Sequence, residues 1–242
     1  MSDFADAAKK LSYVFVPRRC ELCGEIVELD ELMCDDCKRL IPISSPRCMQ
    51  CGCSKDDCSC KKHKNEYKQL AGVYYYEGSI VRAVHNFKDL NMPFLSKRFA
   101  CDMLKVIDEC YSDIAFDYVT FVPLRSFKEH KRGYNQSQLI AEHISKSMNV
   151  QMLPMLQKIR YTGVQHKKSE QQRKADIFGA YDVKGKFRNS IENKIILLVD
   201  DVKTTGSTLC ECAKMLNIYG AKEVYAISFA LTKKEKHSSK YI

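Results

Sequence analysis

From residue 69 onward, the hydrophobic positions alternate between the two-residue period of strands and the longer period of helices. Segments rich in β-branched and aromatic residues, which predict strands, are 70–76, 117–124, 194–199 and 223–231. Segments with apolar residues at helical spacing are 79–90, 94–110, 134–148 and 207–220. In the first helix we expect Ile80, Val81, Val84 and Phe87 to share the buried face. This alternation predicts βαβ units, and therefore an α/β fold whose parallel sheet is covered on both faces.

The rest of the chain divides by composition. The predicted parts are an amphipathic lead-in at 1–16, a cysteine-rich module at 17–64, the α/β domain at 69–232 and a flexible tail at 233–242. The lysine-rich stretch after Cys60 is expected to be a solvated linker.

Cysteine usage is the most unusual feature of the composition. Of 13 cysteines, nine lie between Cys20 and Cys60, most of them in CxxC pairs. The N-terminus has no apolar region typical of a signal peptide, and no apolar run approaches the ~18 residues of a membrane span. We therefore expect a cytoplasmic protein, in which clustered CxxC pairs indicate metal rather than disulfides.

The first half of the module has the spacing of a complete zinc site. Cys20-x2-Cys23-x10-Cys34-x2-Cys37 supplies two knuckles, each with two thiolates for one tetrahedral ion. Four thiolates leave no position for water, so the expected Zn²⁺ is structural. The segment has few large apolar residues, and binding of the metal is expected to fold it.

The second half contains five cysteines for four places. The chosen ligands are Cys48, Cys51, Cys58 and Cys60, because Cys48-x2-Cys51-Gly52 repeats the knuckle. Cys53 in place of Cys58 is an alternative, and His63 is a further candidate. Two Zn²⁺ ions are therefore expected in all, which would make the module a double zinc ribbon.

The formal net charge of +9 indicates a basic surface, although two tetrathiolate zinc sites would lower it by four. Local clusters are more informative. One runs from Lys158 to Lys174 and includes Tyr161, and the other comprises Arg125, Lys128, Lys131 and Arg132. Such clusters are typical of single-stranded nucleic-acid binding, where cations meet phosphates and aromatic rings stack on bases, but also of a solvated surface.

The strongest chemical motif follows the strand at 194–199. Asp200 and Asp201 come directly after this strand, at the sheet edge where α/β proteins bind ligands. Thr204, Thr205, Gly206, Ser207 and Thr208 then lead into a helix whose N-terminus favours a phosphate. The order of a Walker loop is absent, so a different phosphate site is predicted.

The sequence VDDVKTTGST resembles the phosphoribosyl pyrophosphate (PRPP) motif of type I phosphoribosyltransferases. The resemblance implies that Asp200 and Asp201 bind the ribose hydroxyls and that Thr204 to Thr208 cradle the 5′-phosphate. It also implies a Rossmann-like parallel sheet and Mg²⁺ carried on the pyrophosphate.

A narrower resemblance covers nearly the whole chain. The cysteine module, the VPL strand end, HKRGYNQSQ at 130–138 and TGVQ at 162–165 are similar to the ComF family of competence and GntX-type proteins. It implies pyrophosphate contacts from Leu124 and Arg125, and a pyrophosphate or substrate contact from Arg132, whose other interpretation is a surface arginine before a helix. Asn135 or Ser137 is expected to cap that helix.

Two functions follow from this resemblance. One is a competence factor that binds PRPP and contacts incoming single-stranded DNA or the uptake machinery, including a helicase-type partner. The other is a phosphoribosyltransferase, a glycosyltransferase that displaces pyrophosphate at the anomeric carbon. Thr204 occupies a position where purine-salvage enzymes often carry an aspartate, so purine transfer by that route is not expected.

Overall fold

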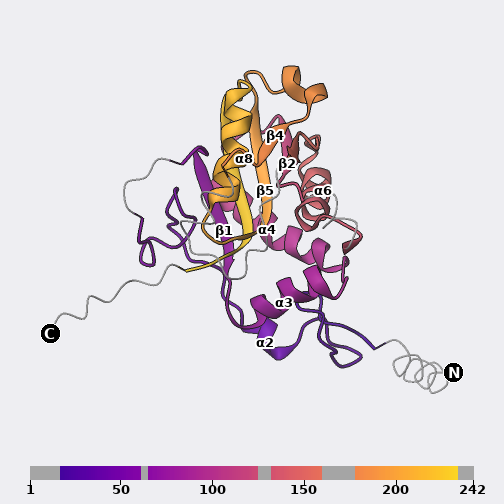
Figure 1. Ribbon diagram of the computed structural model, residues 1–242. Helices are drawn as coiled ribbons and strands as arrows, with labels where there is room; N and C mark the ends of the chain where they lie inside the picture. Colours follow the sequence, from indigo (N-terminus) through magenta and orange to yellow (C-terminus); the bar gives the residue numbers. More distant parts are fainter. Residues whose placement is uncertain (1–16, 61–64, 125–131, 160–177, 234–242) are drawn as a thin grey trace.

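The computed structural model describes residues 17–60, 65–124, 132–159 and 178–233. Its centre is a four-stranded sheet with the strand order β1-β6-β5-β2, in which every neighbouring pair is parallel. The strands are β1 (Gln69–Tyr75), β2 (Tyr118–Phe121), β5 (Ile195–Lys203) and β6 (Glu223–Leu231). Figure 1 shows the sheet at the centre of the molecule. The predicted α/β class is confirmed.

Helices cover the two faces of this sheet. On one face, α4 (Leu95–Tyr111) packs against β1 and β6, and α6 (Gln136–Met148) packs against β2 and β5. On the other, α8 (Ser207–Ile218) packs against β5 and β6. Side chains of β5 alternate accordingly, because Leu197 and Val199 join one core and Ile196 and Leu198 the other.

A second, two-stranded sheet extends the face covered by α8. Its strands, β3 (Leu156–Lys158) and β4 (Tyr181–Val183), are antiparallel, and β4 packs against α8. The 3-10 helix η2 (Gly185–Ser190) follows β4. The sequence analysis predicted none of these three elements, because each is too short to show a hydrophobic period.

The carboxyl edge of the main sheet is bordered by α3 and the cysteine-rich module. Helix α3 (Gly78–Asp89) follows β1, and the four-residue helix α2 (Asp35–Lys38) lies near it (Figure 1). The buried face of α3 contains Ile80, Val84 and Phe87 as expected, but Val81 is 38% exposed. The expectation for Val81 was therefore wrong, and Ala83 lies on the buried face instead.

All eight strands and helices predicted from the hydrophobic pattern are present, with ends that differ by a few residues. The largest difference is in β5, which continues through Asp200 to Lys203 because Val202 and Lys203 still pair with β6. Within the described ranges, no helix combines the length and the apolar character needed to cross a membrane.

Candidate functional site

The cysteines predicted as zinc ligands form two clusters. One consists of Cys20, Cys23, Cys34 and Cys37, and the other of Cys48, Cys51, Cys58 and Cys60. Within each cluster all sulfur atoms lie within 4.8 Å of one another. The Sγ–Sγ distances of 3.6 Å for Cys23–Cys34 and 3.8 Å for Cys51–Cys58 match the edge of a tetrahedron with Zn–S bonds of about 2.3 Å. Both clusters fit a structural zinc ion.

The first knuckle of each cluster has the same backbone. Gly24 donates its N–H to the carbonyl of Cys20 at 2.9 Å, and Gly52 donates to Cys48 at 2.8 Å. Both glycines have positive φ, +78° and +76°, which explains why the motif is CxxCG in both places. The module therefore contains one knuckle twice.

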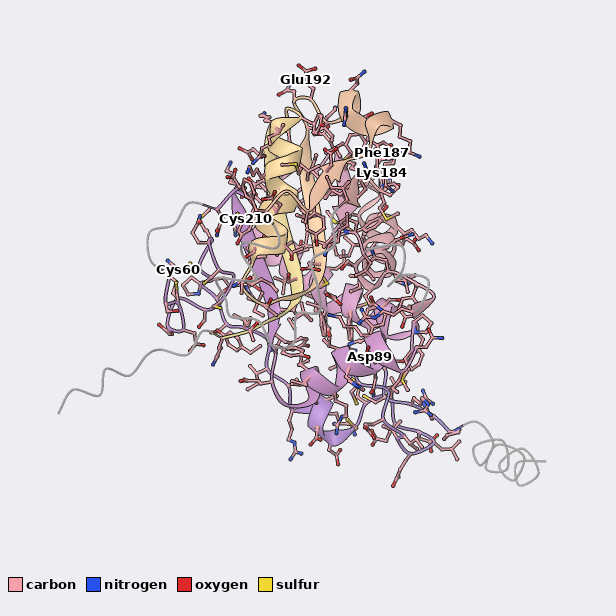
Figure 2. The ribbon with its side chains drawn as sticks, viewed as in Figure 1. Cys60, Asp89, Lys184, Phe187, Glu192 and Cys210 are labelled. Carbon is pink, nitrogen blue, oxygen red and sulfur yellow. The ribbon has the colours of Figure 1, made fainter. Side chains whose placement is uncertain are left out.

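Four of the five cysteines in the second half of the module form the second cluster. Cys53 is buried, and its Sγ contacts the carbonyl oxygen of Cys51 at 4.0 Å rather than joining the sulfur cluster. The other alternative ligand, His63, lies outside the described residues. In Figure 2, Cys60 marks this cluster at the side of the molecule away from Asp89.

Asp200 and Asp201 lie within β5, near its C-terminal end, and not after the strand as predicted. Asp200 and Asp201 are each 7% exposed. One oxygen of Asp200 accepts hydrogen bonds from the Ser137 hydroxyl at 3.2 Å and from the Asp201 N–H at 3.0 Å. Asp201 accepts from the Val202 N–H at 2.7 Å, and its other oxygen forms an ion pair of 2.8 Å with Lys88 Nζ.

Burial and the neighbouring carboxylate of Asp201 raise the pKa of Asp200 to about 8. Lys88 and the hydrogen bonds from Asp201 N–H and Ser137 act in the opposite direction. A carboxyl group kept in such an unfavourable environment is typical of a functional site.

The predicted phosphate loop, Thr204 to Thr208, begins at the exposed Thr204, and its last two residues are the first two of α8, which begins at Ser207. Gly206 precedes the helix with φ +84°, and a Cβ there would lie 3.2 Å from the side chain of Lys203. The Thr205 and Ser207 hydroxyls lie 2.9 Å apart. Partly exposed hydroxyls beside the free N–H groups of a 12-residue helix form a suitable cradle for a phosphate.

The turn before α6 and the start of α6 contain further predicted residues, of which Ser137 contacts the acid pair. Asn135 caps α6 by accepting from the Gln138 N–H at 3.3 Å, whereas Ser137 binds Asp200 instead of capping. Arg132 contacts Gln136 and Asp89, each at 3.4 Å. The side-chain nitrogen of Gln136 is buried and, within the described residues, has no hydrogen-bond partner.

Two lysines of this site were missed by the sequence analysis. Lys88 reaches Asp201 from the last turn of α3, and the buried Lys203 at the end of β5 donates to the carbonyl of Cys51 at 3.3 Å. Neither contact has a local signal, because the partners are far apart in the sequence. Leu124 follows β2 and is half-buried. Arg125, Lys128, Lys131 and the basic stretch 160–174 lie outside the described residues.

Two known domain families match parts of this chain. Residues 11–66 match the double zinc ribbon domain, and residues 135–242 match the phosphoribosyl transferase domain. The chain therefore combines a zinc-ribbon module with a domain of the phosphoribosyltransferase class.

Relatives share this architecture over most of their length. The chain is 25% identical to "Competence protein F" of Haemophilus influenzae over 85% of this chain and 93% of the relative. It is 27% identical to "Competence protein ComFC" of Bacillus subtilis, over 79% and 80%. It is 26% identical to "DNA utilization protein YhgH" of Escherichia coli K12, over 86% and 95%. The chain is thus similar to competence and DNA-utilization proteins over most of its length.

Among solved structures, an adenine phosphoribosyltransferase from Saccharomyces cerevisiae is 16% identical and has a TM-score of 0.37. The match covers 59% of this chain and 72% of that one.

Proposed function

We propose that this chain is a PRPP-binding factor for the handling of single-stranded DNA during competence. The observation that carries the proposal is the buried acid pair of Asp200 and Asp201 at the carboxyl edge of the sheet, directly before a phosphate cradle. The relatives whose names refer to competence and DNA utilization support the cellular role.

Each group of residues is assigned to one part of PRPP. Asp200 and Asp201 accept the ribose hydroxyls, and Thr204, Thr205, Gly206, Ser207 and Thr208 hold the 5′-phosphate. Leu124, Arg125 and Arg132 are assigned to the pyrophosphate side, where Mg²⁺ would screen the negative charge of the ligand. The side-chain nitrogen of Gln136, which has no partner among the described residues, supports a ligand at this edge, since buried donors are rarely left unpaired.

A second function, transfer of the phosphoribosyl group to an acceptor, is favoured by the completeness of the same loop. The exposed Thr204 offers no carboxylate as a base, so the enzyme would act through orientation and phosphate electrostatics. Incubation with PRPP and Mg²⁺ across nucleobases and short single strands, followed by pyrophosphate measurement, separates a transferase from a binding protein.

The PRPP assignment has a direct test. Replacing both acids (Asp200→Asn and Asp201→Asn) keeps their shape but removes the charged acceptors. Charge-assisted hydrogen bonds are worth roughly 1.5–3 kcal/mol, so the affinity for Mg²⁺-PRPP should fall at least about tenfold. Calorimetry would measure the fall, and equal binding by wild type and variant would contradict the assigned roles.

A further inference from the structure

Lys88 forms an ion pair with Asp201, one of the two acids of the site. Its ammonium lies 2.8 Å from an Asp201 oxygen, with 24% of the lysine side chain and 10% of the aspartate side chain exposed. A pair this far from solvent is screened less than an ordinary surface ion pair. Within the described part of the chain, no other lysine or arginine forms an ion pair with either acid.

The contact between Lys88 and Asp201 affects the charge balance of the site. Repulsion between two adjacent carboxylates disfavours the ionisation of both at a buried sheet edge, and one ammonium beside them offsets that repulsion. The three hydrogen-bond donors of an ammonium also allow Lys88 to hold Asp201 while directing further donors at a ligand oxygen. Asp201 is thereby held by the Val202 N–H on one oxygen and by Lys88 on the other.

The helix that carries Lys88 is anchored on both sides of this contact. Asn86, two residues earlier, donates its amide to the carbonyl of Cys23 in the first cysteine cluster at 2.7 Å. Phe87 is fully buried, and its carbonyl accepts a hydrogen bond from the Tyr134 hydroxyl. Asp89 binds Arg132 at 3.4 Å. The last turn of α3 is therefore fixed between the zinc module and the turn before α6, near Asp89 in Figure 2.

From this geometry we propose that Lys88 is a positioning residue of the PRPP site. It balances the charge of the acid pair and holds the Asp201 carboxylate in the orientation that receives the ribose hydroxyls. This inference rests on the proposed PRPP function, and it assigns to the site a residue from a segment that lies before the matched phosphoribosyl transferase domain at 135–242.

A double-mutant cycle tests the proposal with Mg²⁺-PRPP as the probe. The proteins are wild type, Lys88→Met, Asp201→Asn, the double variant, and Lys88→Arg. Lys97→Met, which removes an exposed lysine from α4, is the matched control. Calorimetry gives the dissociation constants. For variants that bind too weakly for calorimetry, the rise in melting temperature at millimolar PRPP is measured and compared instead.

We expect Lys88→Met to weaken PRPP binding at least about fivefold, and Lys88→Arg to recover most of that loss. In the Asp201→Asn background, Lys88→Met should have little further effect, because the carboxylate on which it acts is gone. Equal losses in both backgrounds, or no loss at all, would overturn the role of Lys88. If wild type itself does not bind PRPP, the proposed function fails first and this inference fails with it.

Discussion

At the scale of single residues, Asp200 links the stability of the fold to its function. Burial raises its pKa to about 8, far above the ordinary value of 3.8. The folded state therefore keeps a proton at neutral pH that the unfolded chain releases above pH 4. The stabilising effect of that proton is complete below pH 4 and is lost as pH rises through about 8. Functional sites commonly carry such a cost in stability.

The fall in stability with rising pH leads to a prediction for Asp200→Asn. The variant cannot ionise at this position, so its free energy of unfolding should not show the decline between pH 4 and 8. At pH 8 it should be more stable than wild type, while PRPP binding weakens. Urea unfolding across this pH range measures the difference, with Asp113→Asn as an exposed control. Parallel pH curves for Asp200→Asn and wild type would contradict the raised pKa.

At the scale of elements, the two ribbons repeat one knuckle, and a carbonyl from each accepts a hydrogen bond from the α/β domain. Cys23 of the first cluster accepts from Asn86 on α3, and Cys51 of the second accepts from Lys203 at the end of β5. The ribbons therefore support the edge of the sheet as well as themselves. Loss of either metal is expected to disturb the residues that surround the acid pair.

The metal content provides the prediction at this scale. Purified protein should contain about two zinc ions per chain, each held by four thiolates at about 2.3 Å. Cys58→Ser should lose the second zinc, whereas Cys53→Ser should keep both, because the Cys53 sulfur stands outside the cluster. Elemental analysis and X-ray absorption measure this. Loss of zinc from Cys53→Ser but not from Cys58→Ser would reverse the ligand assignment.

The sequence predicted those elements whose signal is local. Leu197 and Val199 on β5, or Phe87 on α3, belong to hydrophobic periods long enough to identify a strand or a helix. The Leu156–Lys158 strand is too short for such a period, so β3 was missed. The candidate site divides in the same way. Asp200 to Thr208 form one continuous motif, whereas Lys88 meets Asp201 only because α3 packs at the sheet edge.

At the scale of the whole molecule, the phosphate loop and the cysteine module border one end of the sheet. Glu192, which precedes β5, lies at the other end, with Lys184 and Phe187 nearby (Figure 2). Of the two basic clusters of the sequence, Arg132 and Lys158 are among the described residues, whereas Arg125, Lys128, Lys131 and the stretch 160–174 lie outside them.

The competence interpretation predicts that the protein binds single-stranded oligonucleotides with little sequence preference and a steep dependence on salt. For single strands, the logarithm of the binding constant falls against the logarithm of salt with a slope of about −0.7 per phosphate neutralised. Charge reversal at Arg160, Lys167 and Lys168 should flatten the slope and leave the affinity for PRPP nearly unchanged. Fluorescence anisotropy at two salt concentrations measures both the affinity and the slope.

The control is an equal reversal of charge on exposed lysines of the described surface, Lys97, Lys186 and Lys222. Loss of positive charge in general lowers the affinity of both triple variants for single strands. Only the variant of the basic stretch should show a flatter salt slope, because only it loses cations that neutralise phosphates directly. Equal slopes for the two variants would remove the basic stretch as the binding surface. If wild type binds no single strand near about 50 mM salt, direct DNA contact is excluded, and the competence role must act through a protein partner.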